Sequence, residues 1–151
     1  MTSPRPHQSL VALSTLRAAD VMTTDPVAVA DHESLAVAWE LLARAGCRFL
    51  PVLRSGRVVG VIDDHAMVMV RSTRWQDGRP RTVGDAVKRA RTVDSGLPLP
   101  EVIELLASGL NVLVVVDRIG EPEGLITAEG IVQLLDRILG RLVERESGAA
   151  C

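Results

Sequence analysis

Aromatic residues are scarce in this sequence of 151 residues, which contains two tryptophans, one phenylalanine and no tyrosine. Single-stranded nucleic acids are commonly bound by stacking their bases on aromatic side chains, and few such platforms exist here. The formal net charge of -2 also lacks the positive excess that neutralises a phosphate backbone. Nucleic acid is therefore not an expected partner, and the protein core is expected to be aliphatic.

Cysteine and long apolar runs are also rare. The two cysteines, Cys47 and Cys151, have no second Cys or His at metal-ligand spacing, so no disulfide framework or metal site is predicted from them. Cys47 precedes an apolar run and is interpreted as a small core residue rather than a nucleophile. The apolar run at residues 10–13 is too short for a signal sequence or a membrane span, so a cytoplasmic protein without membrane association is expected.

The sequence does contain an internal repeat. With 47% hydrophobic and 24% charged residues the composition is that of a globular protein, and three segments of the first half recur in order in the second half. The matching pairs are 18–22 with 83–87, 49–53 with 112–116, and 60–63 with 124–127. Their nearly constant separation indicates duplication, and each half is predicted to contain a short strand, a helix, two strands and a final helix.

The first half begins with a strand predicted at residues 27–29. Apolar residues then recur at helical spacing over residues 35–45. Asp31 or Ser34 can cap the start of this helix, and Gly46 is suited to its end.

Two further strands, at 49–53 and 58–62, flank a four-residue hairpin connection at 54–57. A second helix is predicted to start near Asp64.

In the second half Pro100 fits the first turn of a helix that runs to about Ala107 and ends before Gly109. The uniformly apolar residues 112–116 predict a buried strand, and residues 118–123 a hairpin loop. The last helix begins after Thr127, and Gly140 should weaken its end.

An apolar stripe follows the last helix. It comprises Ile131, Leu134, Leu135, Ile138, Leu139 and Leu142. Its breadth, together with Trp39 on the first helix, predicts that a second copy of the chain covers part of it, giving a homodimer.

These elements predict an α/β (α+β) fold of two pseudo-symmetric β-α-β-β-α repeats. The predicted divisions are an N-terminal tail 1–16, repeat 1 at 17–75, a linker 76–82, repeat 2 at 83–146 and a C-terminal tail 147–151. A repeat of this size buries too little apolar surface to be stable alone. The two repeats should therefore pack strand against strand across a pseudo-twofold axis, with a cleft on each side.

Over about residues 17–137 the sequence resembles the tandem CBS domain pair, or Bateman module. The resemblance is carried by residues 18–23, 49–52 and 60–63, each with a counterpart in the second half. It implies a non-catalytic regulatory module that binds an adenosine-type ligand between its repeats. AMP, ADP, ATP, S-adenosylmethionine and NAD are the ligands to test, no cofactor is required, and dimerisation is implied.

The family pattern ends a strand with a Ser or Thr and places an Asp shortly after it, as acceptor for the ribose hydroxyls. Here the first repeat has Asp63 and Ala66 at these positions, and the second has Thr127 and Gly130. Asp63 disfavours a phosphate unless a cation intervenes. Thr127 starts the long helix, where free backbone donors favour an anion, so the second repeat is the better candidate site.

Twelve residues are predicted to line the two sites. On one side these are Thr24, Val27, Arg48, Leu50, Pro51, Ile62 and Asp63, and on the other Val93, Val112, Ile126, Thr127 and Gly130. Arg48 is equally compatible with a phosphate contact and with a solvated surface charge.

No catalytic residue is predicted, because no nucleophile motif accompanies the histidines. Asp63, Asp64 and His65 are not predicted to be metal ligands, because helix capping by Asp63 or Asp64 explains the acidic pair. The absence of both ribose acceptors supports an alternative, a structural dimerisation or partner-docking module without a small ligand, whose protein partner is unknown.

Overall fold

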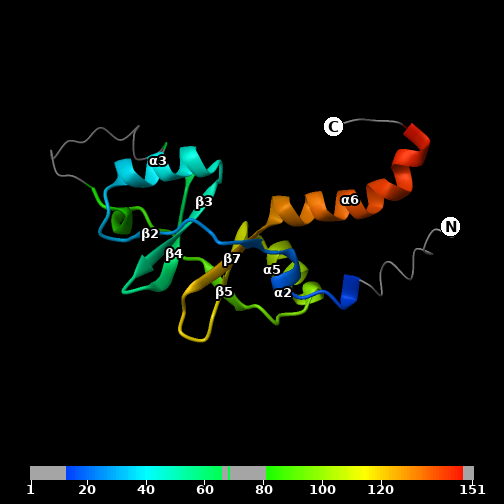
Figure 1. The fold of residues 1–151 in the computed structure, drawn as a ribbon, viewed down its shortest axis with the longest axis horizontal. Helices are drawn as coiled ribbons and strands as arrows, with labels where there is room; N and C mark the ends of the chain where they lie inside the picture. Colours follow the sequence, from blue (N-terminus) through cyan, green and yellow to red (C-terminus); the bar gives the residue numbers. More distant parts are fainter. Residues whose placement is uncertain (1–12, 66–67, 69–80, 148–151) are drawn as a thin grey trace.

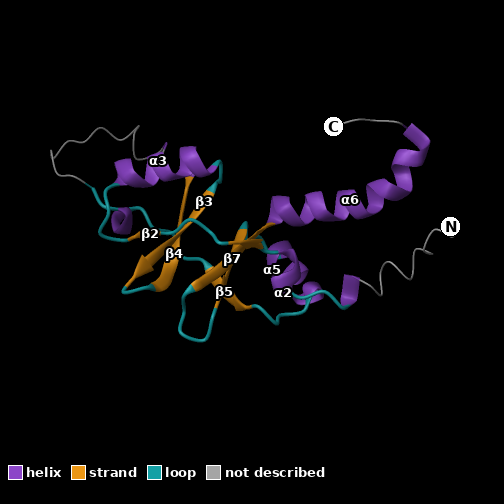
Figure 2. Cartoon of the chain, viewed as in Figure 1, coloured by secondary structure: helices purple, strands orange, loops and turns teal. Residues whose placement is uncertain are grey.

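The computed structural model describes residues 13–65, 68 and 81–147 (Figure 1). The chain folds as a mixed α/β structure in which helices pack on the outer sides of two sheets (Figure 2). The elements are α2 (Ala18–Val21), β1 (Thr23–Thr24), β2 (Val29–Ala30), α3 (Leu35–Ala45), β3 (Phe49–Arg54), β4 (Arg57–Asp63), the 3-10 helix η1 (Val83–Asp85), β5 (Arg91–Asp94), α5 (Leu99–Ala107), β6 (Val112–Val116), β7 (Pro122–Thr127) and α6 (Ala128–Ser147). The predicted fold class is confirmed.

The first sheet has the order β2-β3-β4, with β2 parallel and β4 antiparallel to β3. Helix α3 covers one face of it and has the predicted ends, since the Ser34 hydroxyl accepts from the Val37 N–H at 3.3 Å and Gly46 is left-handed at φ 61°. The side chains of Leu35 and Leu42 on α3 pack with Leu50 of β3 in one core.

Two predicted boundaries in the first half are wrong. The first strand is Val29–Ala30 rather than 27–29. The hairpin connection is also shorter than the predicted 54–57, because β3 continues to Arg54 and β4 begins at Arg57. Ser55 and Gly56 both have positive φ, at 52° and 77°, which is the backbone of a tight turn that follows the twist of its strands.

The second sheet has the order β1-β7-β6-β5. Helices α5 and α6 match their predicted positions, but β7 begins at Pro122, so the hairpin loop is shorter than 118–123. Helix α6 passes through Gly140 without ending and projects beyond the rest of the described chain (Figure 1).

The segment that leads into each repeat packs on the other repeat. Ala18 of α2 is fully buried in the core of the second half, and Val83 of η1 is fully buried in the core of the first half. Strand β1 likewise adds to the second sheet by pairing with β7. The two halves are therefore interlocked by an exchange of short segments, which the sequence analysis did not predict.

A third core joins the two sheets. Phe49 and Val61 from the first sheet pack with Val112 and Val114 from the second, and all four are buried. The predicted strand-to-strand packing of the repeats is thereby confirmed. Within the part of the chain that the structure describes, no helix combines the length and apolarity needed to cross a bilayer.

Candidate functional site between the repeats

Asp63 and Thr127 occupy equivalent places on the two sheet faces that meet between the repeats. Asp63 lies directly opposite Phe49 in the β3–β4 register, and Thr127 lies opposite Val112 in the β6–β7 register. Opposed residues of antiparallel strands project from the same face of a sheet. Because Phe49 and Val112 belong to the inter-repeat core, Asp63 and Thr127 both face the opposite repeat.

In the first repeat Asp63 is already paired with a cation. The Nζ atom of Lys88 lies 3.0 Å from Oδ2 of Asp63, whose side chain is only 15% exposed. Lys88 is held there by its backbone, whose N–H donates to the Val61 carbonyl at 2.8 Å and whose carbonyl accepts from the Val61 N–H at 2.9 Å. The cation that a phosphate would require beside Asp63 therefore comes from the chain itself and is engaged.

In the second repeat Thr127 caps helix α6. Its Oγ1 accepts from the Gly130 N–H at 2.9 Å, and a Cβ atom on Gly130 would lie 2.9 Å from that oxygen. The Ala128 N–H donates to the Asn111 carbonyl at 3.0 Å, and Glu129 occupies the first turn. The expectation of free backbone donors at this helix start is thus wrong for Ala128 and Gly130.

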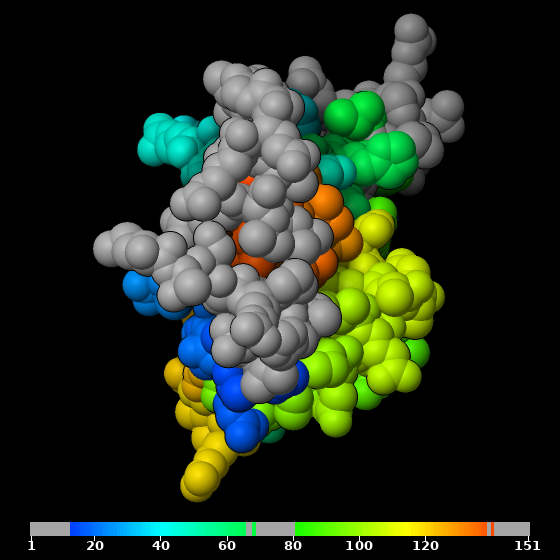
Figure 3. Space-filling model, turned by 90° about the vertical axis from the view of Figure 1, so that its right-hand side faces the viewer, coloured from blue at the N-terminus to red at the C-terminus, as the bar shows by residue number. Residues whose placement is uncertain are grey.

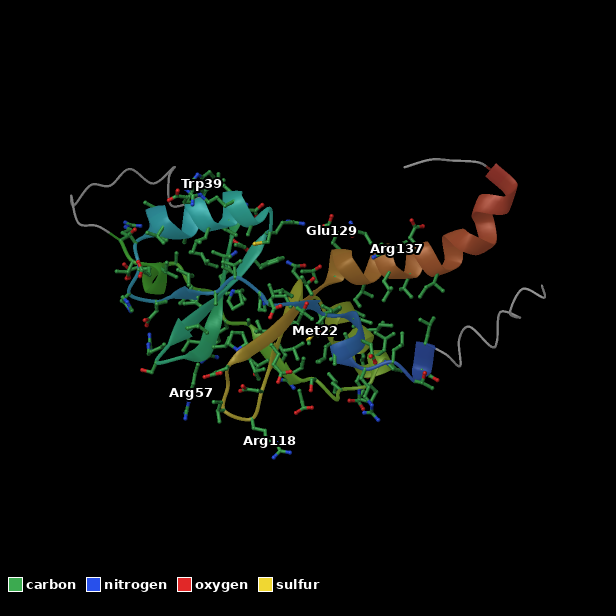
Figure 4. All side chains as sticks on the ribbon, in the orientation of Figure 1. Met22, Trp39, Arg57, Arg118, Glu129 and Arg137 are labelled. Atoms are coloured by element: carbon green, nitrogen blue, oxygen red, sulfur yellow. The ribbon has the colours of Figure 1, made fainter. Side chains whose placement is uncertain are left out.

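Arg48 joins the two repeats at their surface. Its guanidinium donates to Oε2 of Glu129 at 3.0 Å and lies 4.0 Å from Oδ2 of Asp64. It also lies 5.9 Å from the centre of the Phe49 ring. Neither sequence interpretation, a phosphate contact or a solvated charge, included this ion pair, whose partners are 81 positions apart. Figure 4 shows Glu129 at the start of α6.

Breaking the Arg48–Glu129 pair is expected to have a small effect on stability. Both side chains are more than half exposed, and such pairs contribute about 0.2–1 kcal/mol because water screens them. A double-mutant cycle of Arg48→Ala and Glu129→Ala, followed by urea denaturation, measures the coupling energy. The Arg44–Glu40 pair within α3 is the matched control. A coupling energy well above 1 kcal/mol for Arg48 alone would contradict the expectation.

Eight of the twelve predicted site residues divide into two groups. Pro51, Asp63, Val112 and Thr127 lie at positions of the faces between the repeats. The side chains of four others are instead buried in the cores beneath the helices: Leu50, Ile62, Val93 and Ile126.

One predicted residue lies on the other side of the repeat pair from the one expected. Thr24 was grouped with Asp63, but its strand β1 pairs with β7, opposite Gly124, so it belongs to the side of Thr127. Val27 lies before β2 and is 41% exposed.

Thr23 and Lys88 were missed as site residues. Thr23 pairs with Leu125 of β7, and Lys88 pairs with Val61, which is the equivalent residue of β4. Both residues also follow equivalent lead-in segments, so Thr23 and Lys88 occupy equivalent positions. Aligning the two repeats one residue further would have identified them.

The acidic residues at the end of β4 diverge. The Asp63 carboxylate binds Lys88, whereas the Asp64 carboxylate lies toward Arg48. Among residues 13–65, 68 and 81–147 no three His, Cys, Asp or Glu side chains gather as metal ligands. Cys47 packs against the first core, and burial raises the pKa of its thiol above the usual value, which disfavours the reactive thiolate.

Comparison with known proteins agrees with this geometry. The family model described as CBS domain matches the sequence twice, over residues 18–72 and 83–137, which confirms the resemblance. No curated protein matches.

Several solved structures are similar. CBSX2 in complex with AMP is 25% identical, with a TM-score of 0.69 over 82% of this chain and 98% of that one. The CBS domain pair of protein MJ0100, in complex with 5′-methylthioadenosine and S-adenosyl-L-methionine, is 21% identical, with a TM-score of 0.69 over 81% and 97%. The CBS domain of the bacterial CNNM/CorC family Mg2+ transporter is 23% identical, with a TM-score of 0.71 over 89% and 81%.

Proposed function

Because the chain belongs to the CBS domain family and contains two such domains, we propose that it is a non-catalytic regulatory module that binds an adenosine-containing ligand between its repeats. The ligand site is the Thr127 side of the pair. Occupancy acts by stabilising one arrangement of the two interlocked halves over another, since a ligand shifts an equilibrium only through differential affinity.

The arrangement of two hydroxyl groups beside the inter-repeat core carries this proposal. Thr23 lies opposite Leu125 on β7, and Thr127 lies two residues further along the same strand, so the two threonines project from one face. Hydroxyl groups both donate and accept, which suits ribose and adenine. Leu125, which lies opposite Thr23 and is only partly buried against the inter-repeat core, offers an apolar surface to the base. Two similar solved structures contain adenosyl compounds.

The local charges favour an adenosyl ligand without phosphate groups. Around the start of α6 the two carboxylates of Asp64 and Glu129 share the single guanidinium of Arg48. The Ala128 and Gly130 amides that could bind a phosphate are engaged in other hydrogen bonds. A phosphate would therefore meet excess negative charge without compensating donors, whereas a thioether or a sulfonium group would not.

Thermal denaturation tests this function. We expect 5′-methylthioadenosine and S-adenosylmethionine to raise Tm saturably, and AMP, ADP, ATP and NAD to raise it less. A ligand at 100-fold excess over its Kd stabilises the folded state by about 2.7 kcal/mol. Thr127→Ala should abolish the rise, and Ser108→Ala, at an exposed hydroxyl at the end of α5 and outside the site, should retain it. A larger response to the phosphorylated compounds would contradict the charge argument.

A structural dimerisation module is the second candidate, favoured by one observation on α6. Val132 is 64% exposed on this projecting helix, part of which Figure 3 shows in orange. Leu135 of the predicted dimer stripe packs into the second core, and the side chains of Leu139 and Leu142 lie outside the described residues. No thermal response to any adenosyl compound, together with a concentration-dependent dimer in sedimentation that Val132→Glu disrupts, would establish this role instead.

A further inference from the structure

The two sides of the repeat pair differ chemically at equivalent positions. On one side the inward positions carry two hydroxyl side chains, Thr23 and Thr127, and on the other they carry an ammonium and a carboxylate, Lys88 and Asp63. Backbone pairing fixes the equivalence, because Thr23 pairs with Leu125 just as Lys88 pairs with Val61.

The position of the Lys88–Asp63 ion pair is fixed by the backbone. Lys88 is the only lysine of the chain, and two backbone hydrogen bonds to Val61 hold it beside Asp63. The Asp63 side chain is only 15% exposed, and Lys88 compensates the charge of its carboxylate. A ligand could reach this position only by displacing Lys88 and so breaking the ion pair of a mostly buried carboxylate, and the neutral 5′-methylthioadenosine supplies no cation in return.

We propose, as an inference that rests on the proposed function, that only one side of the repeat pair binds a ligand. The Asp63–Lys88 ion pair closes the first-repeat side, and the chain binds a single adenosyl ligand beside Thr127. Asp63 and Lys88 are thus the residues that set the stoichiometry. They act by occupying the place of a second ligand.

The test is titration calorimetry with 5′-methylthioadenosine and S-adenosylmethionine on the full chain. One ligand per chain is expected for the unaltered protein. The double variant Asp63→Thr/Lys88→Thr gives the first side the same hydroxyl pair as the second and is expected to bind two. The exchanged variant Asp63→Lys/Lys88→Asp keeps an ion pair of reversed polarity and is expected to bind one, and circular dichroism verifies that each variant is folded.

The outcomes separate this inference from the proposed function. Two ligands on the unaltered chain would overturn the closure, and a double variant that is folded but still binds one would overturn the role of the ion pair. In the double variant, adding Thr127→Ala should leave one site. If neither compound binds the unaltered chain, the proposed function fails, and the closure is then decided by the double variant alone: a gained site supports it, and no gain overturns it.

Discussion

Replacing Gly60 by Ala is expected to destabilise the chain by about 3 kcal/mol, the upper part of the range for overpacking a tight contact. A Cβ atom at Gly60 would lie 2.2 Å from the Lys88 carbonyl oxygen and 2.7 Å from Cγ2 of Val87. The carbonyl is backbone and accepts from the Val61 N–H, so it cannot move without breaking the contact between β4 and the exchanged segment. The midpoint of urea denaturation measures the loss.

Two other glycines provide controls for this prediction. Gly124 is the counterpart of Gly60, but a Cβ atom there would first meet Sδ of Met22, at 2.5 Å, and only then the Thr23 carbonyl at 2.8 Å. The thioether of Met22, which follows α2 (Figure 4), can move, so Gly124→Ala should cost less. Gly140 in α6 has no atom within 4 Å of its Cβ position, so Gly140→Ala should stabilise the chain by about 0.5–1 kcal/mol. Equal effects at all three positions would contradict the steric explanation.

Gly60 and Gly124 also show which features of the fold could be predicted from the sequence and which could not. The duplication of Gly60 and Gly124 was visible as part of the repeat, but its reason was not. Each glycine makes room for the segment that leads into the other repeat. Nothing in the local sequence of residues 18–24 or 83–88 indicates which half they pack against, because both choices bury the same apolar side chains.

The ends of helices were predicted well because they depend on residues that are neighbours in the sequence. Ser34 and Gly46 mark the ends of α3, and Pro100 lies in the first turn of α5, as the capping rules require. Boundaries were wrong where a turn was tighter than expected, at Ser55-Gly56.

The candidate site was predicted less completely, since it depends on pairs that are distant in sequence. The Asp63–Lys88 and Arg48–Glu129 contacts join residues separated by 25 and 81 positions. The sequence supplied Asp63 and Thr127 through the repeat and the family pattern. A longer alignment of the repeats would have drawn attention to Lys88, but its pairing with Asp63 is set by the exchange of segments, and that of Arg48 with Glu129 by the packing of the two halves.

Phe49→Ala is expected to cost about 3–5 kcal/mol, because it removes the largest side chain of the core between the two sheets. Phe49 is 9% exposed and packs with Val61, Val112 and Val114, so its loss leaves a cavity lined by both halves. Urea denaturation followed by circular dichroism measures the loss.

Trp39→Ala is the matched aromatic truncation. Trp39 lies on α3, away from the second sheet, and is 38% exposed, so its replacement should cost clearly less than that of Phe49 (Figure 4). The two halves should still unfold together in Phe49→Ala, because α2 and η1 remain buried in the opposite cores. Two separate transitions would instead mean that the packing of Phe49 between the sheets, and not the exchanged segments, makes the pair unfold as one unit. A cost no greater than that of Trp39→Ala would contradict a stabilising role for the inter-repeat core.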